Sequence, residues 1–549
     1  MVRLDAAGAL PLVVALGGHR DLREEDVPTL EARVREALSD LRRRHPHTPL
    51  VLLCSLAEGA DRLGARVALA LGIGLVASLP LPREEYERDF TTPASRAEFA
   101  DLLGRARDWF AVSTPPGSTR EHAYARAAAY ITQRSQLVIA LWDGEPAHHE
   151  AGTAALARFA LAGVPEGYGE PRSPLDTAEC RPVAHIVTPR RGRRVPPGAL
   201  SLRWLYPGDY GGDAAARKAF DGIWSRVEAF DRDAARLGPP PGGPGDDLLS
   251  DTGAGPLPPR LRSMLGCYAW ADALSIHFQA RTGRTLAALL VLAFLAAAAL
   301  QGHPLVHGAT RALNLLYVAS LGAAYGVWLW SRRARYQTKY LDYRALAEGL
   351  RVQIFWRLAG LEAAAADHYL RKQRSELDWI RRAMRGWDLG PWEGGRLAGA
   401  PAALASVLER WVKPQSAYFA RAARRNDSRH QKIRRCGYAF FAVALLLALA
   451  KQFLTAQHPL LVVVGLVPVV AALSQVWADK LALAPLAKQY GRMALVFAAA
   501  ETALTAAIDK GDDARAQAIV QELGIEALAE NADWVLIHRD RPVQVPGAK

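Results

Sequence analysis

Four long apolar segments stand out in the pattern of hydrophobic and polar positions. Each contains fifteen to twenty consecutive residues without a charge, and they form two pairs whose members are about ten residues apart. A helix rises about 1.5 Å per residue, so such segments approach the roughly 30 Å hydrocarbon core of a bilayer. A buried helix of a soluble domain explains one such segment but poorly explains four. We therefore predict four transmembrane helices in two hairpins, with spans at about 285–303, 312–331, 436–454 and 460–478.

The basic residues predict how these spans are oriented. Seventeen Lys and Arg residues lie within fifteen residues of the outer ends of the hairpins, whereas only Arg311 and Lys451 lie in the turns. Short loops rich in basic residues stay on the cytoplasmic side of a membrane. We therefore expect both termini and the segment between the hairpins in the cytoplasm. Much of the net charge of +13 is then a topology signal, which makes nucleic acid the least favoured partner.

Residues 10–205 alternate short apolar runs with amphipathic stretches. Glu24–Arg44 and Ala60–Leu71 have the periodicity of helices that bury one face. Strands that alternate with helices are typical of a doubly wound, mostly parallel sheet. The expected fold class is an α/β Rossmann-like doubly wound domain followed by an all-α membrane domain with four transmembrane helices. The predicted strands are Leu12–Leu16, Leu50–Cys54, Gly74–Leu79, Leu137–Trp142 and Val183–Val187.

A linker rich in proline and glycine at Gly238–Asp247 separates this region from the helical half. There, each hairpin is preceded and followed by a predicted cytoplasmic helix, so a unit of helix, two spans and helix occurs twice. The two copies share little sequence, and the duplication is inferred from their layout. The predicted divisions are 1–205 (α/β domain), 206–260 (helical extension and linker), 261–360 (first two-span unit), 361–415 (cytoplasmic helical connector), 416–510 (second two-span unit) and 511–549 (cytoplasmic tail).

Three turns at the predicted carboxyl edge of the sheet carry small and polar residues that suit an anionic ligand. Backbone amides at such turns and at helix starts can approach an anion closely, and ligands of open α/β sheets bind at this edge. Alternatives remain open: the pair Gly17 and Gly18 can form a plain turn, and Asp61 can serve only the helix dipole. The candidate ligand-binding residues are Gly17, Gly18, His19, Arg20, Ser55, Glu58, Gly59, Asp61, Asp143, Gly144, Gly152 and Thr153.

These motifs resemble those of the SLOG superfamily, the Rossmann-like domains related to the DprA DNA-processing protein and the LOG phosphoribohydrolases. Residues 56–61 are similar to the DprA pattern L-A-x-G-[IA]-D, residues 18–20 to its G-S-R turn, and residues 152–153 to the G-T of the LOG motif. The helical half resembles two copies of the SLATT-type two-span membrane effectors. The resemblance covers roughly residues 10–190 and 260–510, and it implies a nucleotide-derived ligand that is a signal rather than a cofactor.

One departure from these families concerns catalysis. LOG enzymes carry G-T-x-x-E, whose glutamate supports glycosidic cleavage, and here Leu156 occupies that position. Loss of the carboxylate removes a stabiliser of the oxocarbenium-like transition state, with Glu150 as the alternative carboxylate. Binding is therefore favoured over hydrolysis. Adjacent His148 and His149 would point about 100° apart on a helix, so we expect no metal site there.

The resemblance implies a sensor–effector of bacterial antiviral defence. In this hypothesis the cytoplasmic domain captures a nucleotide or nucleotide-derived small molecule, and the spans of a homo-oligomer open or assemble into a pore. The lipid bilayer is then the second partner, and the location is the bacterial inner membrane. Two alternatives are a membrane-tethered nucleotide phosphoribohydrolase and, less favoured, a DNA-binding protein of the DprA kind.

Overall fold

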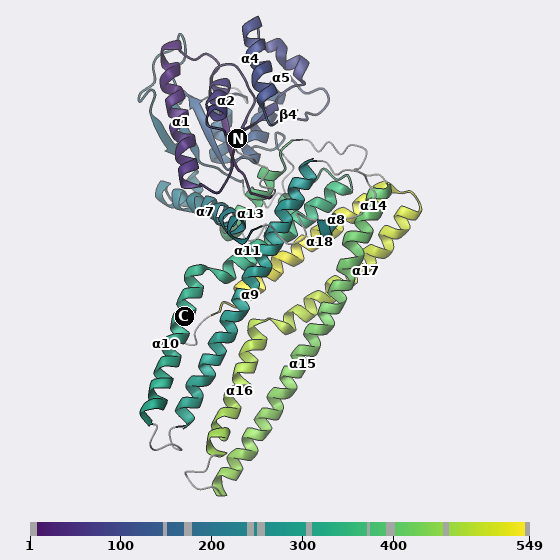
Figure 1. Ribbon diagram of the computed structural model, residues 1–549. Coiled ribbons are helices and arrows are strands. Elements are labelled where there is room, and N and C mark those ends of the chain that lie inside the picture. Colours follow the sequence, from purple (N-terminus) through teal and green to yellow (C-terminus); the bar gives the residue numbers. More distant parts are fainter. Residues whose placement is uncertain are drawn as a thin grey trace. The chain divides into compact units, whose positions relative to one another are not determined.

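The computed structural model of the protein describes residues 8–146, 151–169, 178–238, 246–249, 259–302, 310–369, 374–390, 401–453 and 460–543. The chain divides into two units, which we name by their content (Figure 1). Each unit includes stretches that are far apart in the sequence. The α/β unit comprises Met1–Gly245, Leu257–Trp270 and Glu362–Gly395, and the helical unit comprises Asp246–Pro256, Ala271–Leu361 and Arg396–Lys549.

A seven-stranded sheet forms the centre of the α/β unit. Its strand order is β4-β3-β2-β1-β5-β6-β7, and every pair is parallel except β6 and β7. The order reverses between β1 and β5, so this is the topological switch point at which open α/β sheets bind ligands. The strands are β1 (Leu12–Gly18), β2 (Leu50–Cys54), β3 (Gly74–Leu79), β4 (Asp108–Ala111), β5 (Leu137–Trp142), β6 (Val183–Val187) and β7 (Leu202–Leu205).

The Rossmann-like fold and the five predicted strands are confirmed, whereas β4 and β7 were missed. Both missed strands have only four residues and lie at the edges of the sheet, where one face or more remains exposed. Trp109 of β4 is 42% exposed. Short edge strands carry no long apolar run, so hydrophobic pattern alone gives no signal for them.

Helices cover both faces of this sheet, as the alternating side chains of β1 require. Leu12, Val14 and Leu16 pack into one core with α1 and α2. Val13 and Ala15 point to the opposite face and pack into a second core with α5 and α6. The principal helices of the α/β unit are α1 (Val27–Arg44), α2 (Ala60–Ala70), α3 (Arg83–Tyr86), α4 (Pro93–Arg105), α5 (Arg120–Arg134), α6 (Thr153–Ala162) and α7 (Asp213–Leu237).

A helix from the middle of the chain, α13 (Arg374–Trp387), completes the α/β unit. Buried Gln136 accepts a hydrogen bond from the backbone of Val13 (2.6 Å) and donates one to the carbonyl of Arg382 (3.0 Å). The amide of Gln136 therefore joins α13 to the first strand. The described residues 362–369 and 374–390, which the sequence suggested as part of a connector between the two-span units, thus belong to the same unit as the sheet.

Buried charge strengthens this attachment. The carboxylate of Glu179 lies 2.9 Å from Arg381 and 3.5 Å from Arg181, and it also pairs with Arg385. Burial by itself raises the pKa of a carboxyl, but the guanidinium groups of Arg385 and Arg381 hold the pKa of Glu179 well below its ordinary value. Removal of one member of such a buried network leaves uncompensated charge, which is strongly destabilising.

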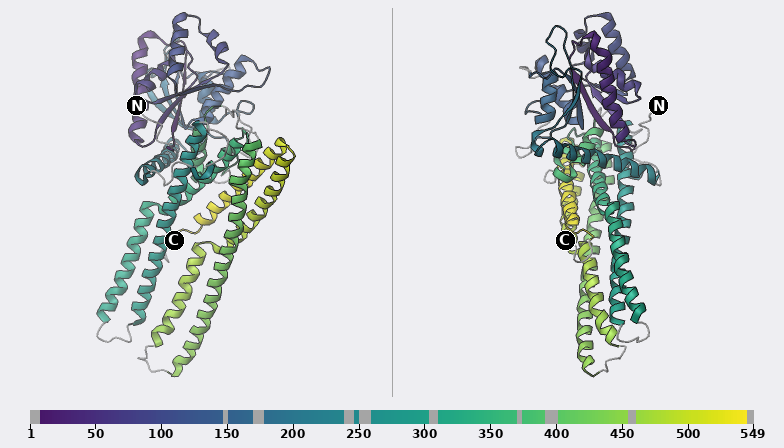
Figure 2. Two further views of the ribbon diagram at one scale, coloured as in Figure 1. Left: turned by 45° about the vertical axis from the view of Figure 1, so that its right-hand side comes forward. Right: turned by 90° about the vertical axis from the view of Figure 1, so that its left-hand side faces the viewer.

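Four helices are long and apolar enough to cross a bilayer, as the predicted fold class requires. They are the candidate spans within Arg260–Gly302, Thr310–Leu358, Ala402–Ala450 and Val462–Asp509. Neighbouring α15 and α16 stay side by side in both views of Figure 2. The helices of the helical unit are α8 (Asp246–Leu249), α9 (Pro259–Gly302, which begins in the α/β unit), α10 (Thr310–Ala334), α11 (Tyr336–Leu358), α14 (Pro401–Val407), α15 (Lys413–Ala450), α16 (Leu460–Lys480), α17 (Leu483–Asp509) and α18 (Asp513–Arg539). The short helix α12 (Ala365–His368) belongs to the α/β unit.

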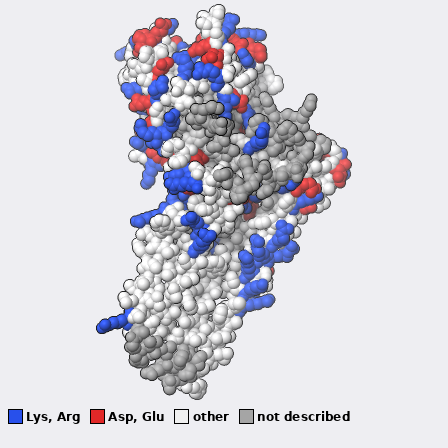
Figure 3. Space-filling view, viewed as in Figure 1, with Lys and Arg blue, Asp and Glu red and all other residues white. Residues whose placement is uncertain are grey.

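The apolar side chains of these helices are largely exposed on the protein surface. Leu315 is 70% exposed and Phe441 is 72% exposed. Figure 3 shows the corresponding stretch of surface as nearly free of acidic and basic side chains. Contiguous apolar surface of this extent is unfavourable in water and is typical of contact with lipid.

The two hairpins end in the same local structure. α10 and α11 meet at Arg335, and α16 and α17 meet near Ala482; both residues have left-handed backbone, with φ of 56° and 51°. A residue with a Cβ adopts this conformation at a cost of roughly 1–2 kcal/mol. The same uncommon break after the second helix of each hairpin supports the duplication inferred from the layout.

Candidate functional site

A cavity of about 400 Å³ lies at the carboxyl end of β1, beside the topological switch point. Its volume falls in the range of small-molecule sites. The cavity is bordered by the loops after β1 and β2, by α5 and by the start of α6. Its lining residues are Leu16, Gly17, Gly18, His19, Arg20, Asp21, Ser55, Ala57, Asp61, Tyr86, Tyr124, Ala127, Ala128, Ile131, Gly152, Thr153, Leu156 and Arg190.

The structure brings two thirds of the predicted site residues together around this cavity. The predicted residues that line it are Gly17, Gly18, His19, Arg20, Ser55, Asp61, Gly152 and Thr153. The remaining four do not line it and support its loops instead. These four are Glu58, Gly59, Asp143 and Gly144.

The two glycines after the first apolar run belong to β1 and do not form a turn. Gly17 pairs with Ala140 and Gly18 with Leu141 in the parallel ladder. A Cβ on Gly17 would lie 2.5 Å from Leu156, and one on Gly18 would lie 2.4 Å from Ala60. The expectation of a glycine turn was therefore wrong: glycine is needed here because α2 and α6 pack closely on the end of the strand.

Asp61 at the start of α2 organises the loop after β2. Its carboxylate accepts hydrogen bonds from the backbone amides of Ser55 and Ala57, both at 3.3 Å. The side chain is 5% exposed, and this burial raises its pKa to about 6, against the lowering effect of the two amides and of Arg20. Asp61 therefore both holds the loop and presents a carboxyl to the cavity.

Gly59 and Glu58 hold the same loop from outside the cavity. Gly59 has a φ of +77°, and a Cβ there would lie 2.5 Å from the carbonyl oxygen of Arg20. Glu58 accepts a hydrogen bond from the hydroxyl of Ser95 on α4 and so turns away from the cavity. Close approach of the loops after β1 and β2 thus requires a glycine at position 59.

Arg20 is the exposed cation of the cavity. Its guanidinium donates a hydrogen bond to the hydroxyl of Tyr124 (3.3 Å) and lies 3.9 Å from the carboxylate of Asp89. The Tyr124 hydroxyl in turn donates to Asp89. Because a guanidinium has five N–H donors, Arg20 retains donors for a ligand after these contacts.

Asp143 positions His19 and does not face the cavity. The backbone amide of Asp143 donates to Nε2 of His19 (3.0 Å), and its carboxylate lies 3.2 Å from the same nitrogen. Burial lowers the pKa of His19, against the raising effect of Asp143, which favours the neutral ring. Gly144 lies near His185, with a φ of +90°. Both residues therefore shape the turn after β5.

Among the lining residues that sequence reasoning missed are two tyrosines and an arginine that lie outside the predicted motifs. Arg190 lies beyond β6 and donates to both oxygens of Asp21 (3.0 and 3.1 Å). Tyr124 comes from α5. Tyr86 packs its ring against Phe90, and its buried hydroxyl has no hydrogen-bond partner in the part of the chain that the structure describes. No motif marks these positions, because each reaches the cavity only through the packing of its helix or loop.

Leu156 lines the cavity at the position where LOG enzymes have glutamate. Leu156, Ile131 and Ala128 add apolar side chains to a lining that is otherwise rich in polar residues. The alternative carboxylate Glu150 lies outside the described residues, as do His148 and His149. The cavity thus offers apolar side chains, two guanidinium groups, and the carboxyls of Asp21 and Asp61.

Comparisons with known proteins give no family assignment. No protein-family model matches the chain, and no curated protein matches it significantly. The resemblance to SLOG domains and to SLATT-type effectors therefore stays a prediction.

Proposed function

We propose that the protein is a membrane-anchored sensor–effector. Its α/β unit binds a nucleotide-derived anion, and the bound state changes the arrangement of the four apolar helices so that they open or assemble into a pore. By the resemblance in sequence, this activity belongs to bacterial antiviral defence at the inner membrane. The observation that carries the proposal is the cavity at the switch point, in a chain with four membrane-capable helices.

The apolar and the charged lining residues of the cavity suit the two halves of a nucleotide. Leu156 and Ile131 offer apolar contact to a base, and the guanidinium groups of Arg20 and Arg190 suit a phosphate. The buried hydroxyl of Tyr86 adds an unused donor. An unpaired buried polar group is costly, so a ligand that bonds to it gains affinity and specificity.

A continuous helix supplies the link to the membrane. The first turns of α9 belong to the α/β unit, and the same helix contains the first apolar span. Arg260 in these turns donates to Asp108 of β4 (3.1 Å). A ligand that binds one state more tightly by the roughly 1–3 kcal/mol of ordinary allosteric coupling can shift such a helix.

Two glycines on α10 support assembly of several copies. A Cβ on Gly322 or Gly326 would meet no atom within 4 Å, so this small-residue face is open. Gly465 of α16, by contrast, already packs against Gln301. Close packing of helices in lipid uses such small residues, which fits a homo-oligomer.

Binding is tested with the full-length protein in lipid nanodiscs and the four ribonucleoside mono- and diphosphates. We expect one of these to bind, and Arg20→Gln to weaken it roughly tenfold or more, since a charge-assisted contact is lost. Arg23→Gln is the matched control, because Arg23 is on the same loop but pairs with Glu25 and does not line the cavity. An equal loss of nucleotide affinity in both variants would contradict the proposed binding site.

Pore activity is tested by dye release from liposomes that contain the protein. The nucleotide that binds should start release, and Arg20→Gln should shift the required concentration by the same factor as it shifts the affinity. Liposomes that stay sealed at saturating ligand would refute the effector function while leaving the binding site intact.

The hydrolase alternative is tested in the same samples. Leu156 leaves no carboxylate at the position used by LOG enzymes, so we expect no free base when the bound nucleotide is analysed by chromatography. Steady release of free base would show that the protein is an enzyme and not a sensor. Loss of that release in Asp61→Asn would then identify Asp61 as the carboxyl required for cleavage.

A further inference from the structure

A second cavity, of about 370 Å³, lies inside the helical unit. Helices of both two-span units line it: α9 and α11 from the first, and α15 and α17 from the second, together with α18. On α9 its lining ends at Leu286, where the first apolar segment begins, and Lys480 lies at the end of α16, the fourth. The cavity is therefore level with one end of the spans, the end predicted to be cytoplasmic.

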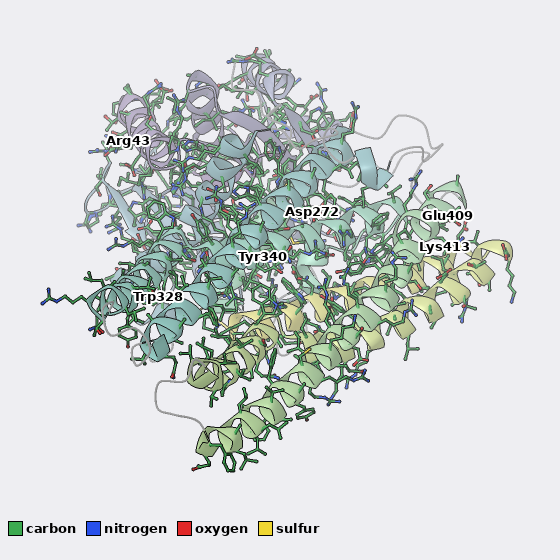
Figure 4. The ribbon with its side chains drawn as sticks, turned by 60° about the horizontal axis from the view of Figure 1, so that its bottom comes forward. Arg43, Asp272, Trp328, Tyr340, Glu409 and Lys413 are labelled. Carbon is green, nitrogen blue, oxygen red and sulfur yellow. The ribbon has the colours of Figure 1, made fainter. Side chains whose placement is uncertain are left out.

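The polar side chains of α9 and α11 at this cavity largely satisfy one another. Tyr340, labelled in Figure 4, accepts a hydrogen bond from Gln279 of α9 (3.2 Å). Arg344 of α11 bonds to Asp272 (3.1 Å) and to Glu348 (2.6 Å). These side chains already have hydrogen-bond or ion-pair partners, so they do not need a ligand.

Glu530 of α18 is different. It lines the cavity, and its Oε1 is fully enclosed without a hydrogen-bond partner in the described part of the chain. Burial, followed by the negative charge of Glu348, raises the pKa of Glu530 to about 8; Asp533 adds to this effect and Arg344 opposes it. At neutral pH the carboxyl is therefore mostly protonated and can donate a hydrogen bond.

The rim of this cavity is basic. Arg425 and Arg429 are one helical turn apart on α15, both exposed, and neither forms an ion pair with another described residue. Lys480 donates to the carbonyl of Pro542 (2.6 Å), and Arg541 completes the rim. Figure 3 shows the basic side chains gathered over this part of α15. Arg541 is paired with Asp479 (3.7 Å), so Arg425 and Arg429 are the rim cations left for a ligand. Two unpaired guanidinium groups near a neutral acid are complementary to an anion.

We propose that this cavity binds the phosphate headgroup of an anionic phospholipid, with Arg425 and Arg429 contacting the phosphate and Glu530 donating to one of its oxygens. A basic pocket between membrane helices at the cytoplasmic end of the spans is where such headgroups bind. Because both two-span units line the cavity, the lipid would bridge them and stabilise one arrangement of the spans. The inference does not depend on nucleotide binding by the α/β unit.

The experiment measures the thermal stability of the full-length protein in a neutral detergent with added phosphatidylglycerol, phosphatidylcholine or inorganic phosphate. We expect phosphatidylglycerol to raise Tm and phosphatidylcholine to have little effect. The double variant Arg425→Gln/Arg429→Gln should need roughly tenfold more phosphatidylglycerol for the same rise, since each basic residue near a lipid surface contributes a severalfold gain in affinity.

The matched control is Arg421→Gln/Arg424→Gln. Both residues are exposed on the same helix and neither lines the cavity, so the change in charge is identical. This control should keep the response of the native protein. If both double variants lose the same part of the response to phosphatidylglycerol, the lipid is attracted by the general positive charge of α15, and the proposed headgroup pocket is wrong. If inorganic phosphate raises Tm as much as phosphatidylglycerol does, the ligand of this cavity is a soluble phosphate and the proposal of a lipid is wrong.

The pH dependence provides a second readout. The groups facing Glu530 are Arg344 and Glu348 on α11, Tyr490 on α17 and Asp533 on α18 itself. As pH rises through about 8, Glu530 ionises and repels the headgroup, so the effect of phosphatidylglycerol should weaken between pH 7 and 9. Glu530→Gln keeps a donor and cannot ionise, so it should remove this weakening. A wild-type response that is flat over this range would exclude Glu530 from the site.

Discussion

The arginines that we assign to a ligand are held differently in the two cavities of this protein. In the α/β unit, Arg190 is paired with Asp21, and Arg20 lies near Asp89. In the helical unit, Arg425 and Arg429 have no ion-pair partner among the described residues. Paired cations are held in a fixed position and suit a specific small ligand, whereas unpaired cations at the end of membrane spans suit a headgroup that the bilayer supplies.

The units also differ in where their apolar side chains point. The strand residues of the sheet are buried between two layers of helices, whereas Phe441 and Leu446 of α15 are 72% and 65% exposed. The same hydrophobicity thus forms a core in one unit and an outer surface in the other. This difference is the clearest physical sign that the helices require lipid around them.

The largest expected effect comes from placing a carboxylate in each environment. Val138→Asp in β5 buries an unpaired charge and should cost about 5 kcal/mol or more, enough to unfold the α/β unit. Leu446→Asp should cost about 2.5–3.5 kcal/mol of insertion free energy if lipid surrounds it. Val195→Asp, at an exposed site in a loop of the α/β unit, is the control and should change little. The measurement is the yield of each variant in the alkali-washed membrane fraction, which should be near that of the native protein only for Val195→Asp. Equal yields for Leu446→Asp and Val195→Asp would show that α15 is surrounded by water and not by lipid.

A second comparison concerns glycines. Gly59→Ala should destabilise the protein by about 3 kcal/mol, because the backbone is left-handed and the new Cβ would clash with the carbonyl of Arg20. Gly322→Ala in α10 should be neutral or stabilising by up to about 1 kcal/mol in the single chain, because the site is open and helical. Thermal unfolding followed by circular dichroism measures both. A stable Gly59→Ala protein would contradict the close approach of the two loops.

The third prediction uses pH on the sensor cavity. The pKa of Asp61 is raised to about 6 from an ordinary 3.8, so its stabilising contribution is complete below about pH 4 and is lost as pH rises through 6. The loss amounts to about 3 kcal/mol. Asp61→Asn should remove this slope, so the difference in unfolding free energy between the variant and the native protein should change across pH 4–6. A difference that stays constant would show that Asp61 has an ordinary pKa.

The smallest effect is a test of independence between the cavities. Measured without nucleotide, Arg20→Gln should leave the response to phosphatidylglycerol unchanged, although it weakens nucleotide binding roughly tenfold. Measured in nanodiscs of phosphatidylcholine alone, Arg425→Gln/Arg429→Gln should leave nucleotide binding unchanged, although it weakens the response to phosphatidylglycerol. A variant that alters both responses under these conditions would show that its arginines do not act at one cavity alone.

Much of the fold could be predicted from the sequence, because its main elements are long, continuous runs of apolar residues. The five inner strands have continuous apolar runs, and the spans have lengths that only a bilayer or a large core can accommodate. The edge strands β4 and β7 were missed because four half-exposed residues form no such pattern. The packing of α13 against β1 depends on Gln136 and Arg382, which no periodicity connects.

The candidate site was predicted only in part, because strand topology places some of its residues and helix packing places the others. Residues directly after β1 and β2 reach the cavity because parallel strands bring their carboxyl ends to one edge. Tyr86 and Arg190 reach it from elsewhere, and Gly59 and Asp143 serve as supports although they belong to the same motifs. Adjacency in a motif shows which loop a residue belongs to but not which way its side chain points.

By itself the sequence determined the class of this protein: a doubly wound sheet followed by two pairs of apolar helices, with the basic residues at the ends of the spans. These features are local, since each follows from the order of apolar and charged residues along a few turns or one strand. Only the tertiary structure decided that α13 belongs to the sheet, that Tyr86 meets Arg20 at one cavity, and that helices of both two-span units enclose Glu530. Such contacts join residues tens to hundreds of positions apart, and they depend on how whole helices pack, which the pattern along the chain does not contain.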